Sequence, residues 1–543
     1  MNEVTIKTIT AVNEPIKPYG PGSPEKESIK KEINRLKSTK IEIPIIIGGQ
    51  EIKTGNTSKC VMPHDHSHIL ATYHNASEVE IKMAIESCLE AQNDWANTSL
   101  DKRCEIFYKM AQLLQNKYRD TINASTMLGQ SKNIFQAEID SACELIDFFK
   151  FNCQYAQEIY ANQPCISPKG FKNHLEYRPL EGFVFAVTPF NFTSIAANLP
   201  SAPALMGNVS IWKPASSSVY SGYFLMQMFK EAGLPDGVIN FIPGKGSIVG
   251  PNVIKNSNLA GVHFTGSTAV FQSMWKEIGN NINNYKSYPR IVGETGGKDF
   301  ILAHESIDPS ELVTAMIRGA FEYQGQKCSA ASRCYIPKSI WKNTKEILLT
   351  EMSTIKMGDV EDFTNFVNAV IDESAFDNIS SYIDYAKKSP DAEIIHGGSY
   401  DKTKGYFIQP TIIVTKDPKF MTMVEEIFGP VLTVYIYDDD WRSICKLVDS
   451  TSEYALTGAI MSKDEKAIEI GSKMLVNSAG NFYINDKPTG AVVGQQPFGG
   501  SRASGTNDKA GSYLNLLRWV SVRTVKETLL PPTDYRYPFM EEK

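Results

Sequence analysis

The sequence of 543 residues lacks any apolar run that approaches the 18 or more residues of a membrane-spanning helix. Its N-terminus has neither the apolar core of a secretory signal nor the arginine-rich, acid-poor composition of a transit peptide, because Glu3 and Glu14 place negative charge there. Low-complexity tracts and internal repeats are also missing. We therefore expect no membrane span, and the N-terminal residues alone do not indicate a compartment.

An excess of positive charge is absent as well. Lys and Arg total 55 and Asp and Glu total 61, so the formal net charge is −6, with a pI near 5.9. Because no broad basic field is available, we expect no nucleic-acid partner and no attraction to anionic lipid. Hydrophobic residues make up 42% and charged residues 21%, which is typical of globular proteins, and the length is sufficient for several domains.

The cysteines contain no CxxC pair, and their number, nine, is odd. This usage predicts reduced thiols, most of them small core residues, rather than a disulfide framework or a zinc site. His64, His66 and His68 alternate in "HDHSH", which would place all three on one face of a strand. Since no other ligand accompanies them, we interpret the segment as a polar surface turn and predict no metal site.

The first forty-five residues are predicted to form an extended arm followed by a helix. Pro15, Pro18 and Pro21 disfavour regular structure, and Ser23–Pro24 is typical of a helix N-cap and first helical residue. The apolar stripe of this helix consists of Ile29, Ile33 and Leu36.

Two more helices precede a change of periodicity. One is predicted to begin at the capping box of Ser77 and Glu80, and another to run through residues 137–160. From about residue 182, short apolar runs are separated by stretches long enough for helices; the runs are "GFVFAVTP", "VSIWKP", "VINFIPG" and "GVHFTGS". This alternation predicts βαβ units, a parallel sheet and an α/β fold. A further mixed region extends from about residue 295 into the 480s.

Three residues have contexts that suit catalysis. Cys328, in "GQKCSAASR", would be a nucleophile if a helix N-terminus lowered its pKa, although one cysteine of nine can equally be structural. Glu294, among the glycines of "GETGGKD", could be a general base or an ordinary exposed glutamate. Asn191, in "TPFNF", could donate to an oxyanion or form an Asx-turn.

Nucleotide binding is suggested without its usual glycine fingerprint. The GxGxxG pattern has no match, but "HFTGST" turns at Gly266 and Ser267, where backbone amides at a helix start could face a pyrophosphate. Lys213 ends the run "IWKPA" and could contact ribose or phosphate, or could be a solvated lysine.

Six segments occur in one order and together resemble the aldehyde dehydrogenase superfamily: "TPFNF", "WKPA", "FTGS", "GETGGKD", "GQKCSA" and "EEIFGPV". The resemblance implies NAD(P)-dependent oxidation of an aldehyde to a carboxylic acid. It assigns Cys328 as the nucleophile, Glu294 as the general base and Asn191 as the oxyanion donor. The implied cofactor contacts are Thr188, Lys213, Gly266, Ser267, Thr268, Glu426 and Phe428.

A closer similarity, which covers nearly the whole chain, is to the branch of this superfamily that oxidises L-glutamate γ-semialdehyde in proline degradation. "CELIDFFKFN", "KEAGLPDGVINFIPG" and "LRWVSVRTVKET" are among the segments that carry it. It implies NAD as cofactor and a substrate carboxylate held by Ser329, Gly490 and Ala491, with Phe192 and Phe498 against the methylenes. The alternatives are another small aldehyde, or NADP, because Ser216 stands where many NAD-selective relatives carry glutamate.

The resemblance also implies an architecture of a Rossmann-like cofactor domain, an α/β catalytic domain and a small oligomerisation flap. The expected ranges are 1–45 for the arm and helix, 46–165 and 181–294 for the NAD-binding domain, 166–180 and 508–543 for the flap, 295–485 for the catalytic domain, and 486–507 for a return segment that lines the substrate site. A homodimer or higher homo-oligomer is implied. The arm favours the mitochondrial matrix, with the cytoplasm as the alternative.

Overall fold

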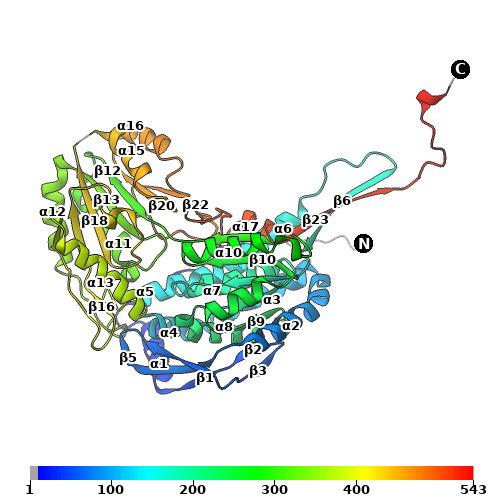
Figure 1. Cartoon of the computed structure of the whole chain (residues 1–543), viewed down its shortest axis with the longest axis horizontal. Coiled ribbons are helices and arrows are strands. Elements are labelled where there is room, and N and C mark those ends of the chain that lie inside the picture. Colours follow the sequence, from blue (N-terminus) through cyan, green and yellow to red (C-terminus); the bar gives the residue numbers. More distant parts are fainter. Residues whose placement is uncertain (1–9, 439, 542–543) are drawn as a thin grey trace.

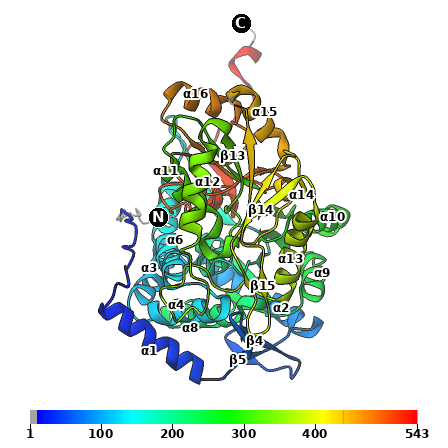
Figure 2. The ribbon, with the colours of Figure 1, turned by 90° about the vertical axis from the view of Figure 1, so that its left-hand side faces the viewer.

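The computed structural model describes residues 10–438 and 440–541, so Glu3 lies outside the described residues. Two seven-stranded sheets, each covered by helices, form the body of the molecule, and a narrow two-stranded ribbon projects from it (Figure 1). This arrangement confirms the predicted α/β fold. Viewed from the side, the N-terminal arm runs along the surface of the body to helix α1 (Pro24–Ser38) (Figure 2).

The first sheet contains the strands predicted from the apolar runs after residue 182. Its strands in spatial order are β11 (Arg290–Glu294), β10 (Leu259–Thr265), β7 (Phe183–Val187), β8 (Val209–Lys213), β9 (Ile239–Phe241), β2 (Ile45–Ile47) and β3 (Gln50–Ile52). The five strands from β11 to β9 are mutually parallel, whereas β2 is antiparallel to β9 and β3 to β2. The prediction of βαβ units is therefore confirmed.

Helices connect successive parallel strands and carry a further helical layer. The connecting helices are α7 (Thr193–Leu205), α8 (Val219–Ala232), α9 (Gly246–Ile254) and α10 (Thr268–Asn280), and the short 3₁₀ turns beside them are Ser216–Ser218 and Ile282–Asn284. The additional helices are α2 (Glu78–Asn97), α3 (Leu100–Gln115), α4 (Arg119–Gln130) and α6 (Glu144–Ala161). Helix α2 packs on β8, α3 and α4 pack on α8, and α6 packs on α7.

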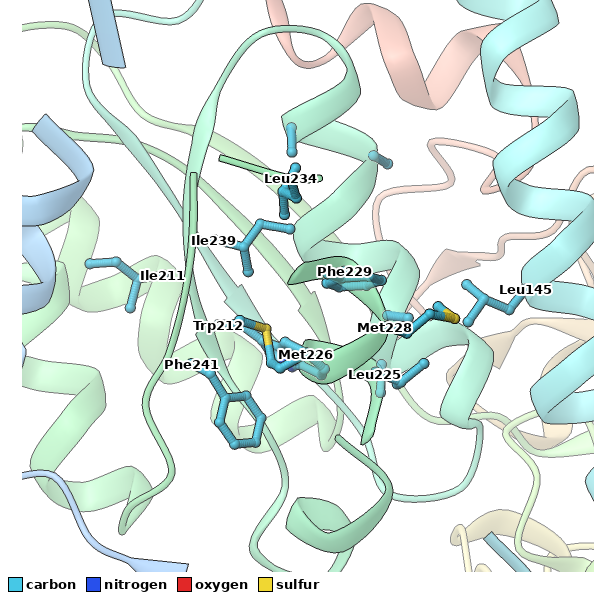
Figure 3. Packing of buried hydrophobic residues seen from close by; sticks show 14 of the residues in the cluster. Leu145, Ile211, Trp212, Leu225, Met226, Met228, Phe229, Leu234, Ile239 and Phe241 are labelled. Carbon is cyan, nitrogen blue, oxygen red and sulfur yellow. The ribbon is translucent and has the colours of Figure 1, made fainter. Parts of the chain in front are cut away.

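Helix α8 packs its apolar side chains against those of β8 and β9 (Figure 3). The Trp212 ring lies edge-to-face on Phe241, with ring centres 4.9 Å apart, and also contacts Phe229 of α8. All three side chains are at most 1% exposed. Burial of one such aromatic side chain contributes about 1.5–3 kcal/mol, so this contact is a major source of stability for the first sheet.

The second sheet lies between β11 and the C-terminal segment in the sequence. Its strands in spatial order are β14 (Ala392–His396), β17 (Thr411–Thr415), β18 (Val431–Tyr437), β13 (Ala331–Pro337), β12 (Asp299–Ala303), β20 (Thr457–Met461) and β21 (Asn481–Ile484). Only β14 is antiparallel to its neighbour. Its helices are α11 (Pro309–Phe321), α12 (Lys338–Met352), α13 (Glu373–Lys388), α14 (Met421–Val424), α15 (Trp441–Thr451) and α16 (Glu465–Met474).

Smaller elements join these layers. A three-stranded sheet has the order β1 (Ile41–Ile43), β5 (Asp65–His74) and β4 (Thr57–Met62). Two short pairs are β15 (Tyr400–Asp401) with β16 (Phe407–Ile408), and β19 (Tyr454–Ala455) with β22 (Ser501–Arg502). The remaining helical turns are α5 (Ile134–Ala137), α17 (Tyr513–Leu517) and the 3₁₀ turns Glu322–Gly325 and Pro538–Met540.

The projecting ribbon pairs β6 (Phe171–Pro179) with β23 (Val520–Thr528). Residues 508–519 precede it and belong to the body, because α17 packs on α6 and Trp519 is completely buried beside His263. The second strand of the ribbon therefore begins at Val520. The domain boundaries expected from the sequence, including those of the flap, remain predictions.

The predicted starts of α1 and α2 are confirmed. Ser23 caps α1 by accepting a hydrogen bond from the Lys26 amide, and Ser77 and Glu80 form a complete capping box on α2. The helix predicted over 137–160 is different in detail, because residues Glu138–Cys143 form a π-helix and α6 begins only at Glu144. The wider turn accommodates the buried carboxylates of Glu138 and Asp140, which face ionic partners from other elements.

The interpretation of residues 64–68 as a polar surface turn is wrong for His64. Its ring is 1% exposed and its Nδ1 atom lies 3.2 Å from the Ser131 hydroxyl. His66 and His68 instead contact the backbone carbonyls of Lys402 and Lys37. The three histidine rings therefore contact different parts of the chain. Within residues 10–438 and 440–541, no group of three His, Cys, Asp or Glu residues is arranged to hold a metal ion.

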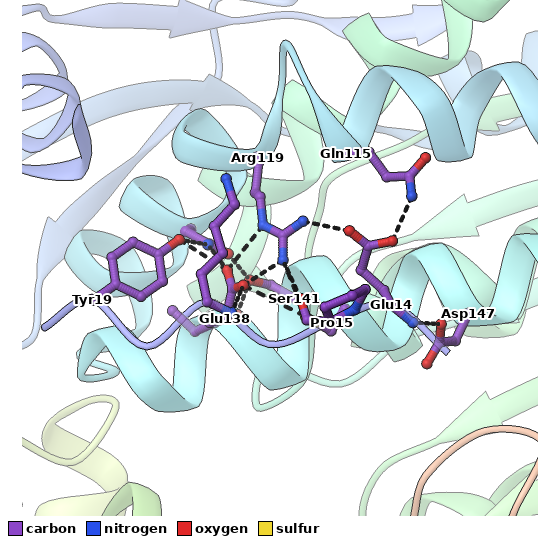
Figure 4. Close-up of polar contacts among 12 residues, drawn as sticks. Glu14, Pro15, Tyr19, Gln115, Arg119, Glu138, Ser141 and Asp147 are labelled. Carbon is purple, nitrogen blue, oxygen red and sulfur yellow. Dashed lines mark hydrogen bonds and ion pairs between the residues drawn. The ribbon is translucent and has the colours of Figure 1, made fainter. Parts of the chain in front are cut away.

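The N-terminal arm is fixed by buried ionic contacts rather than by secondary structure (Figure 4). Arg119 of α4 forms ion pairs with Glu14 of the arm, at 2.7 Å, and with Glu138. Tyr19 donates a hydrogen bond to Glu138, and Asp147 of α6 accepts from the Glu14 amide at 2.7 Å. Although burial alone would raise the pKa of Glu138, the Arg119 guanidinium holds it below its ordinary value.

Candidate functional site

The carboxyl ends of four neighbouring parallel strands meet at one edge of the first sheet. Thr188 follows β7, Lys213 ends β8, Gly266 follows β10 and Glu294 ends β11. Strand pairing aligns these ends, because Val187 is opposite Lys213 in the sheet. Ligands of open α/β sheets bind in the crevice at this edge. The predicted cofactor residues in the loops of this sheet therefore lie where a cofactor would be expected to bind.

Cys328 and Glu294 meet although they belong to different sheets. The Sγ atom of Cys328 lies 3.9 Å from Oε1 of Glu294. Burial raises the pKa of Glu294 to about 8, and Lys509 and the Cys328 thiol oppose that rise. Burial, followed by the nearby negative charge of Glu294, also raises the pKa of Cys328 well above its ordinary value. Burial thus favours the protonated form of both groups.

Cys328 does not lie at a helix N-terminus, the position considered from the sequence because it would lower the pKa of the thiol. The residue lies in a turn between the 3₁₀ turn Glu322–Gly325 and strand β13, and no helix begins there. The local structure supplies no helix terminus to lower its pKa.

Asn191 lies beside the same turn. It is 3% exposed, and its Nδ2 atom donates a hydrogen bond of 3.1 Å to the carbonyl oxygen of Gln326, two residues before Cys328. A carboxamide carries two N–H groups, so this contact fixes the amide plane and leaves one donor for another acceptor. The arrangement suits donation to an oxyanion on a substrate attached at Cys328.

A cavity of about 550 Å³ leads to Cys328. It is bounded by the arm, the start of α6, the turn that carries Cys328 and the return segment 486–507. Predicted residues on its wall are Glu294, Cys328, Ser329, Gly490, Ala491, Phe192 and Phe498. Thr188, Lys213, Ser267, Thr268, Glu426 and Phe428 do not line it, so the predicted substrate residues and cofactor residues occupy separate regions.

The predicted substrate residues lie on both sides of this cavity. Ser329 is 4% exposed, and its Oγ atom is 2.7 Å from Oγ1 of Thr489. Gly490 has a positive φ of 95°, a conformation that glycine adopts readily and that turns the backbone of the return segment. Phe192 packs beneath the Lys132 ammonium, which is 4.4 Å from the ring centre.

The predicted nicotinamide contacts approach the loop after β11 from the second sheet. Oε1 of Glu426 accepts a hydrogen bond of 2.9 Å from the Gly297 amide. A Cβ atom on Gly296 would lie only 2.3 Å from Glu426, so this approach requires glycine. Burial raises the pKa of Glu426 to about 7. Phe428 has a positive φ of 55° and lies edge-to-face on Phe190.

Lys213 is half-buried and has no ionic partner in the described chain. Burial lowers its pKa to about 8, and within the described part of the chain no residue forms a hydrogen bond or ion pair with its Nζ atom. Nearby, Thr188 accepts a hydrogen bond from the Trp212 indole at 2.9 Å. Ser267 caps α10 by accepting from the Val270 amide, and the Thr268 hydroxyl accepts from Gly296. An unpaired ammonium beside a helix start suits a ligand with phosphate or hydroxyl groups.

Residues 51–525 match the sequence profile of the aldehyde dehydrogenase family. The chain belongs to the aldehyde dehydrogenase family.

Relatives within this family are similar over almost the full length. A protein of Dictyostelium discoideum named delta-1-pyrroline-5-carboxylate dehydrogenase, mitochondrial, is 54% identical over 98% of this chain and 96% of its own length. The protein of the same name from Homo sapiens is 45% identical over 98% and 95%. The crystal structure of delta-pyrroline-5-carboxylate dehydrogenase from Mycobacterium tuberculosis bound with NAD has a TM-score of 0.96 and 47% identity, with 100% of both chains covered.

The sequence patterns did not single out two residues that belong to this aldehyde dehydrogenase site. Lys509 bonds the carbonyls of Gly480 and Gly499, at 2.8 and 3.0 Å, and its charge opposes the raised pKa of Glu294. Thr489 is the partner of Ser329. Neither follows a recognisable local pattern, since a lone lysine and a lone threonine near glycines are common in loops.

The cysteine prediction agrees with the structure. All nine thiols are free, and all except Cys165 are buried. No helix within 10–438 and 440–541 is both long and apolar enough to cross a membrane.

Proposed function

We propose that this aldehyde dehydrogenase oxidises L-glutamate γ-semialdehyde, which is in equilibrium with delta-1-pyrroline-5-carboxylate, to L-glutamate with NAD, as the second step of proline degradation. The observation that carries the proposal is the Cys328–Glu294 pair at the wall of a cavity of about 550 Å³. A nucleophile next to a buried base is the arrangement that thioester chemistry on an aldehyde requires. The names of the full-length relatives support the choice of substrate.

The first half of the proposed reaction forms a bond to sulfur. The Cys328 thiol releases its proton to solvent, and the resulting thiolate sulfur attacks the aldehyde carbon. The free N–H of the Asn191 carboxamide and the Cys328 backbone amide donate to the resulting oxyanion. One such donor contributes about 3–4 kcal/mol to the transition state.

The second half releases the acid. After the hydride has left the substrate carbon, the acyl group remains on Cys328 as a thioester. Glu294 then accepts a proton from water, whose oxygen attacks the thioester and frees the Cys328 sulfur. The raised pKa of Glu294 suits this role, because a base whose pKa is near the working pH both accepts and releases a proton readily.

NAD fits the residues at the carboxyl edge of the first sheet. When bound, NAD supplies the hydride acceptor. Lys213, whose ammonium has no ionic partner among the described residues, would bind hydroxyl groups of the adenosine ribose, and the turn at Gly266–Thr268 would face the pyrophosphate. Glu426 would accept hydrogen bonds from the nicotinamide ribose, with Phe428 beside the ring and Thr188 near the β7 end.

The cavity also fits a small amino acid. Ser329 and the backbone amides of Gly490 and Ala491 would hold the α-carboxylate, while Phe192 and Phe498 pack on the methylenes. Lys327 lines the same cavity and supplies a positive charge that attracts a carboxylate.

NADP is the second candidate cofactor, and one observation about Ser216 favours it. Ser216, exposed in the 3₁₀ turn that follows β8, adds no negative charge near Lys213 and so would not repel a 2′-phosphate. A comparison of kcat/KM for NAD and NADP distinguishes the two, and we expect NAD to be favoured. Simple aldehydes such as propanal are the alternative substrates, and we expect them to be poorer because they lack the carboxylate.

The ribbon and the segment after it support assembly into a homodimer or higher homo-oligomer. Residues 529–541 are exposed and include Leu530, Tyr535 and Phe539, each more than 80% exposed. Apolar side chains on an extended segment commonly become buried in a partner. Sedimentation of the whole chain and of a chain ending at residue 519 would test this, with loss of the oligomer expected in the shorter chain. We also propose a mitochondrial matrix location, because relatives are named mitochondrial.

The decisive experiment is NADH production from equilibrated pyrroline-5-carboxylate, with and without prior alkylation by iodoacetamide. We expect activity that alkylation abolishes and that substrate protects. Protein that forms neither NADH from NAD nor NADPH from NADP would contradict the proposal.

A further inference from the structure

The C-terminal end of helix α4 lies between the two segments that carry the reacting groups. On one side, Gln130 contacts the turn that contains Asn191. Its Nε2 atom donates to the Phe190 carbonyl, and its Oε1 atom accepts from the Thr193 hydroxyl at 3.3 Å. The Gln130 side chain therefore bonds residues on both sides of Asn191.

On the other side, the same end of α4 holds the turn that precedes Cys328. The Tyr323 hydroxyl donates to the Gln130 carbonyl at 2.8 Å, and the Gln324 amide donates to the Ser131 carbonyl at 3.0 Å. Tyr323 and Gln324 both have positive φ values, 48° and 55°. Each such conformation costs roughly 1–3 kcal/mol in a residue other than glycine, so these hydrogen bonds retain a backbone shape that is otherwise unfavourable.

All of these contacts are shielded from water. Gln130, Thr193, Tyr323 and Gln324 are each about 1% exposed. A buried side-chain amide that lost its hydrogen-bond partners would be left unsatisfied, which costs free energy of folding. Conformations that break these hydrogen bonds are therefore unfavourable. The Gln130 side chain itself does not line the cavity and bonds neither Cys328 nor Asn191 directly.

We propose that Gln130 is a positioning residue, which fixes the Asn191 carboxamide relative to the Cys328 sulfur. The inference rests on the proposed role of Asn191 as oxyanion donor. Without the Gln130 side chain, the 190–193 turn would retain the Asn191–Gln326 contact and the 2.8 Å contact of Thr193 with Thr126 of α4, but its Phe190 end would lose the hydrogen bond that holds it to α4. Displacement of a catalytic donor by about 1 Å lowers the rate roughly 100-fold.

The test is a double-mutant cycle read out by the pre-steady-state burst of NADH. Gln130→Met keeps the length of the side chain and removes both of its hydrogen bonds. We expect it to slow the burst roughly 10- to 100-fold, with the KM for NAD unchanged within about twofold. In the Asn191→Ala background, the same substitution should slow the burst no further, because the donor that Gln130 positions is already absent.

Two further variants separate positioning from stability. Tyr323→Phe removes only the hydrogen bond to the Gln130 carbonyl, and we expect it to slow the burst to a smaller extent. This variant also tests the proposal if Gln130→Met does not fold. Gln136→Met is the matched control, since Gln136 is equally buried and its Oε1 atom accepts no hydrogen bond from the described residues. We expect the burst of the control to equal that of the unaltered protein.

The outcomes are distinguishable. A normal burst in Gln130→Met and Tyr323→Phe, with a slow one in Asn191→Ala, would overturn the positioning role alone. Slowing by Gln130→Met that multiplies with the Asn191→Ala effect would also overturn it, because the residue would then act independently of Asn191. A normal burst in Asn191→Ala would overturn the proposed role of Asn191 itself.

Discussion

The Sγ atom of Cys328 and the Oε1 atom of Glu294 are 3.9 Å apart, although 34 positions separate the two residues in the chain. Glu294 ends a strand of the first sheet, and Cys328 precedes a strand of the second. The site therefore exists only where the two sheets meet, and its chemistry depends on how firmly they are joined.

Replacement of the nucleophile should separate catalysis from cofactor binding. We expect Cys328→Ala to lower NADH production by roughly 10⁴-fold or more while the Kd for NAD stays within about twofold. Stopped-flow absorbance and calorimetric titration measure the two quantities. Cys334→Ala, which alters another buried thiol on the adjoining strand, should retain activity. Substantial turnover by Cys328→Ala would exclude the thioester route.

Glu294→Gln should leave a visible first turnover and a slow steady state. Loss of a general base typically costs 10²- to 10⁴-fold, so we expect hydrolysis of the thioester to slow roughly 100-fold or more. A burst of NADH of about one equivalent per site, followed by slow turnover, is the expected signature. If the first turnover were slowed as much as the later ones, Glu294 would instead be needed mainly to activate Cys328.

The pH dependence of kcat should report the Glu294 carboxyl. Burial raises its pKa to about 8, and only the carboxylate can accept a proton from water. The kcat of the unaltered protein should therefore rise as pH increases through about 8 and become constant above it. Glu294→Gln should lose this rise. A kcat that is constant between pH 6 and 9 would contradict the assignment.

The same raised pKa affects stability. The folded protein retains a proton on Glu294 that the unfolded chain loses near pH 4.5, so this group destabilises the fold progressively as pH rises from about 4.5 to about 8. Glu294→Gln should consequently gain stability relative to the unaltered protein across this range. Urea midpoints measured at pH 5 and pH 8 test the direction of the change.

Ser329→Ala should impair the recognition of a carboxylate. A hydrogen bond to a charged group contributes about 1.5–3 kcal/mol, so KM for glutamate semialdehyde should rise roughly tenfold or more while KM for propanal changes little. Ser332→Ala is the control, because the Ser332 hydroxyl is buried without a hydrogen-bond partner in the described chain. Equal effects on both aldehydes would remove Ser329 from the carboxylate site.

The ion pairs of the arm should matter for stability. Arg119→Met leaves Glu138 buried without its cation, which typically costs 3–5 kcal/mol, and it removes one of the two cations that pair with Glu14 beside the cavity. We expect a lower urea midpoint and a raised KM for substrate. Arg35→Met is the control, because the Arg35 side chain is 54% exposed and ion pairs that solvent reaches contribute about 0–1 kcal/mol. Similar midpoints for both variants would contradict this assignment.

The sequence by itself determined the features that depend on neighbouring residues. The caps at Ser23 and Ser77 and the four apolar runs of the first sheet could be predicted, because hydrogen bonds and side-chain alternation within a few residues define them. The motif segments indicated the family, and they singled out Cys328 and Glu294 as the candidate pair. None of these patterns determines how far apart two segments lie in the folded protein.

Only the tertiary structure decided how those residues meet and what surrounds them. It buried His64, which the sequence placed on the surface, and it raised the pKa of Cys328 where a helix terminus would have lowered it. It also brought Gln130 against residues 60 and 193 positions away in the chain. The physical reason is that burial and long-range hydrogen bonds arise from packing between distant segments, which no local pattern encodes.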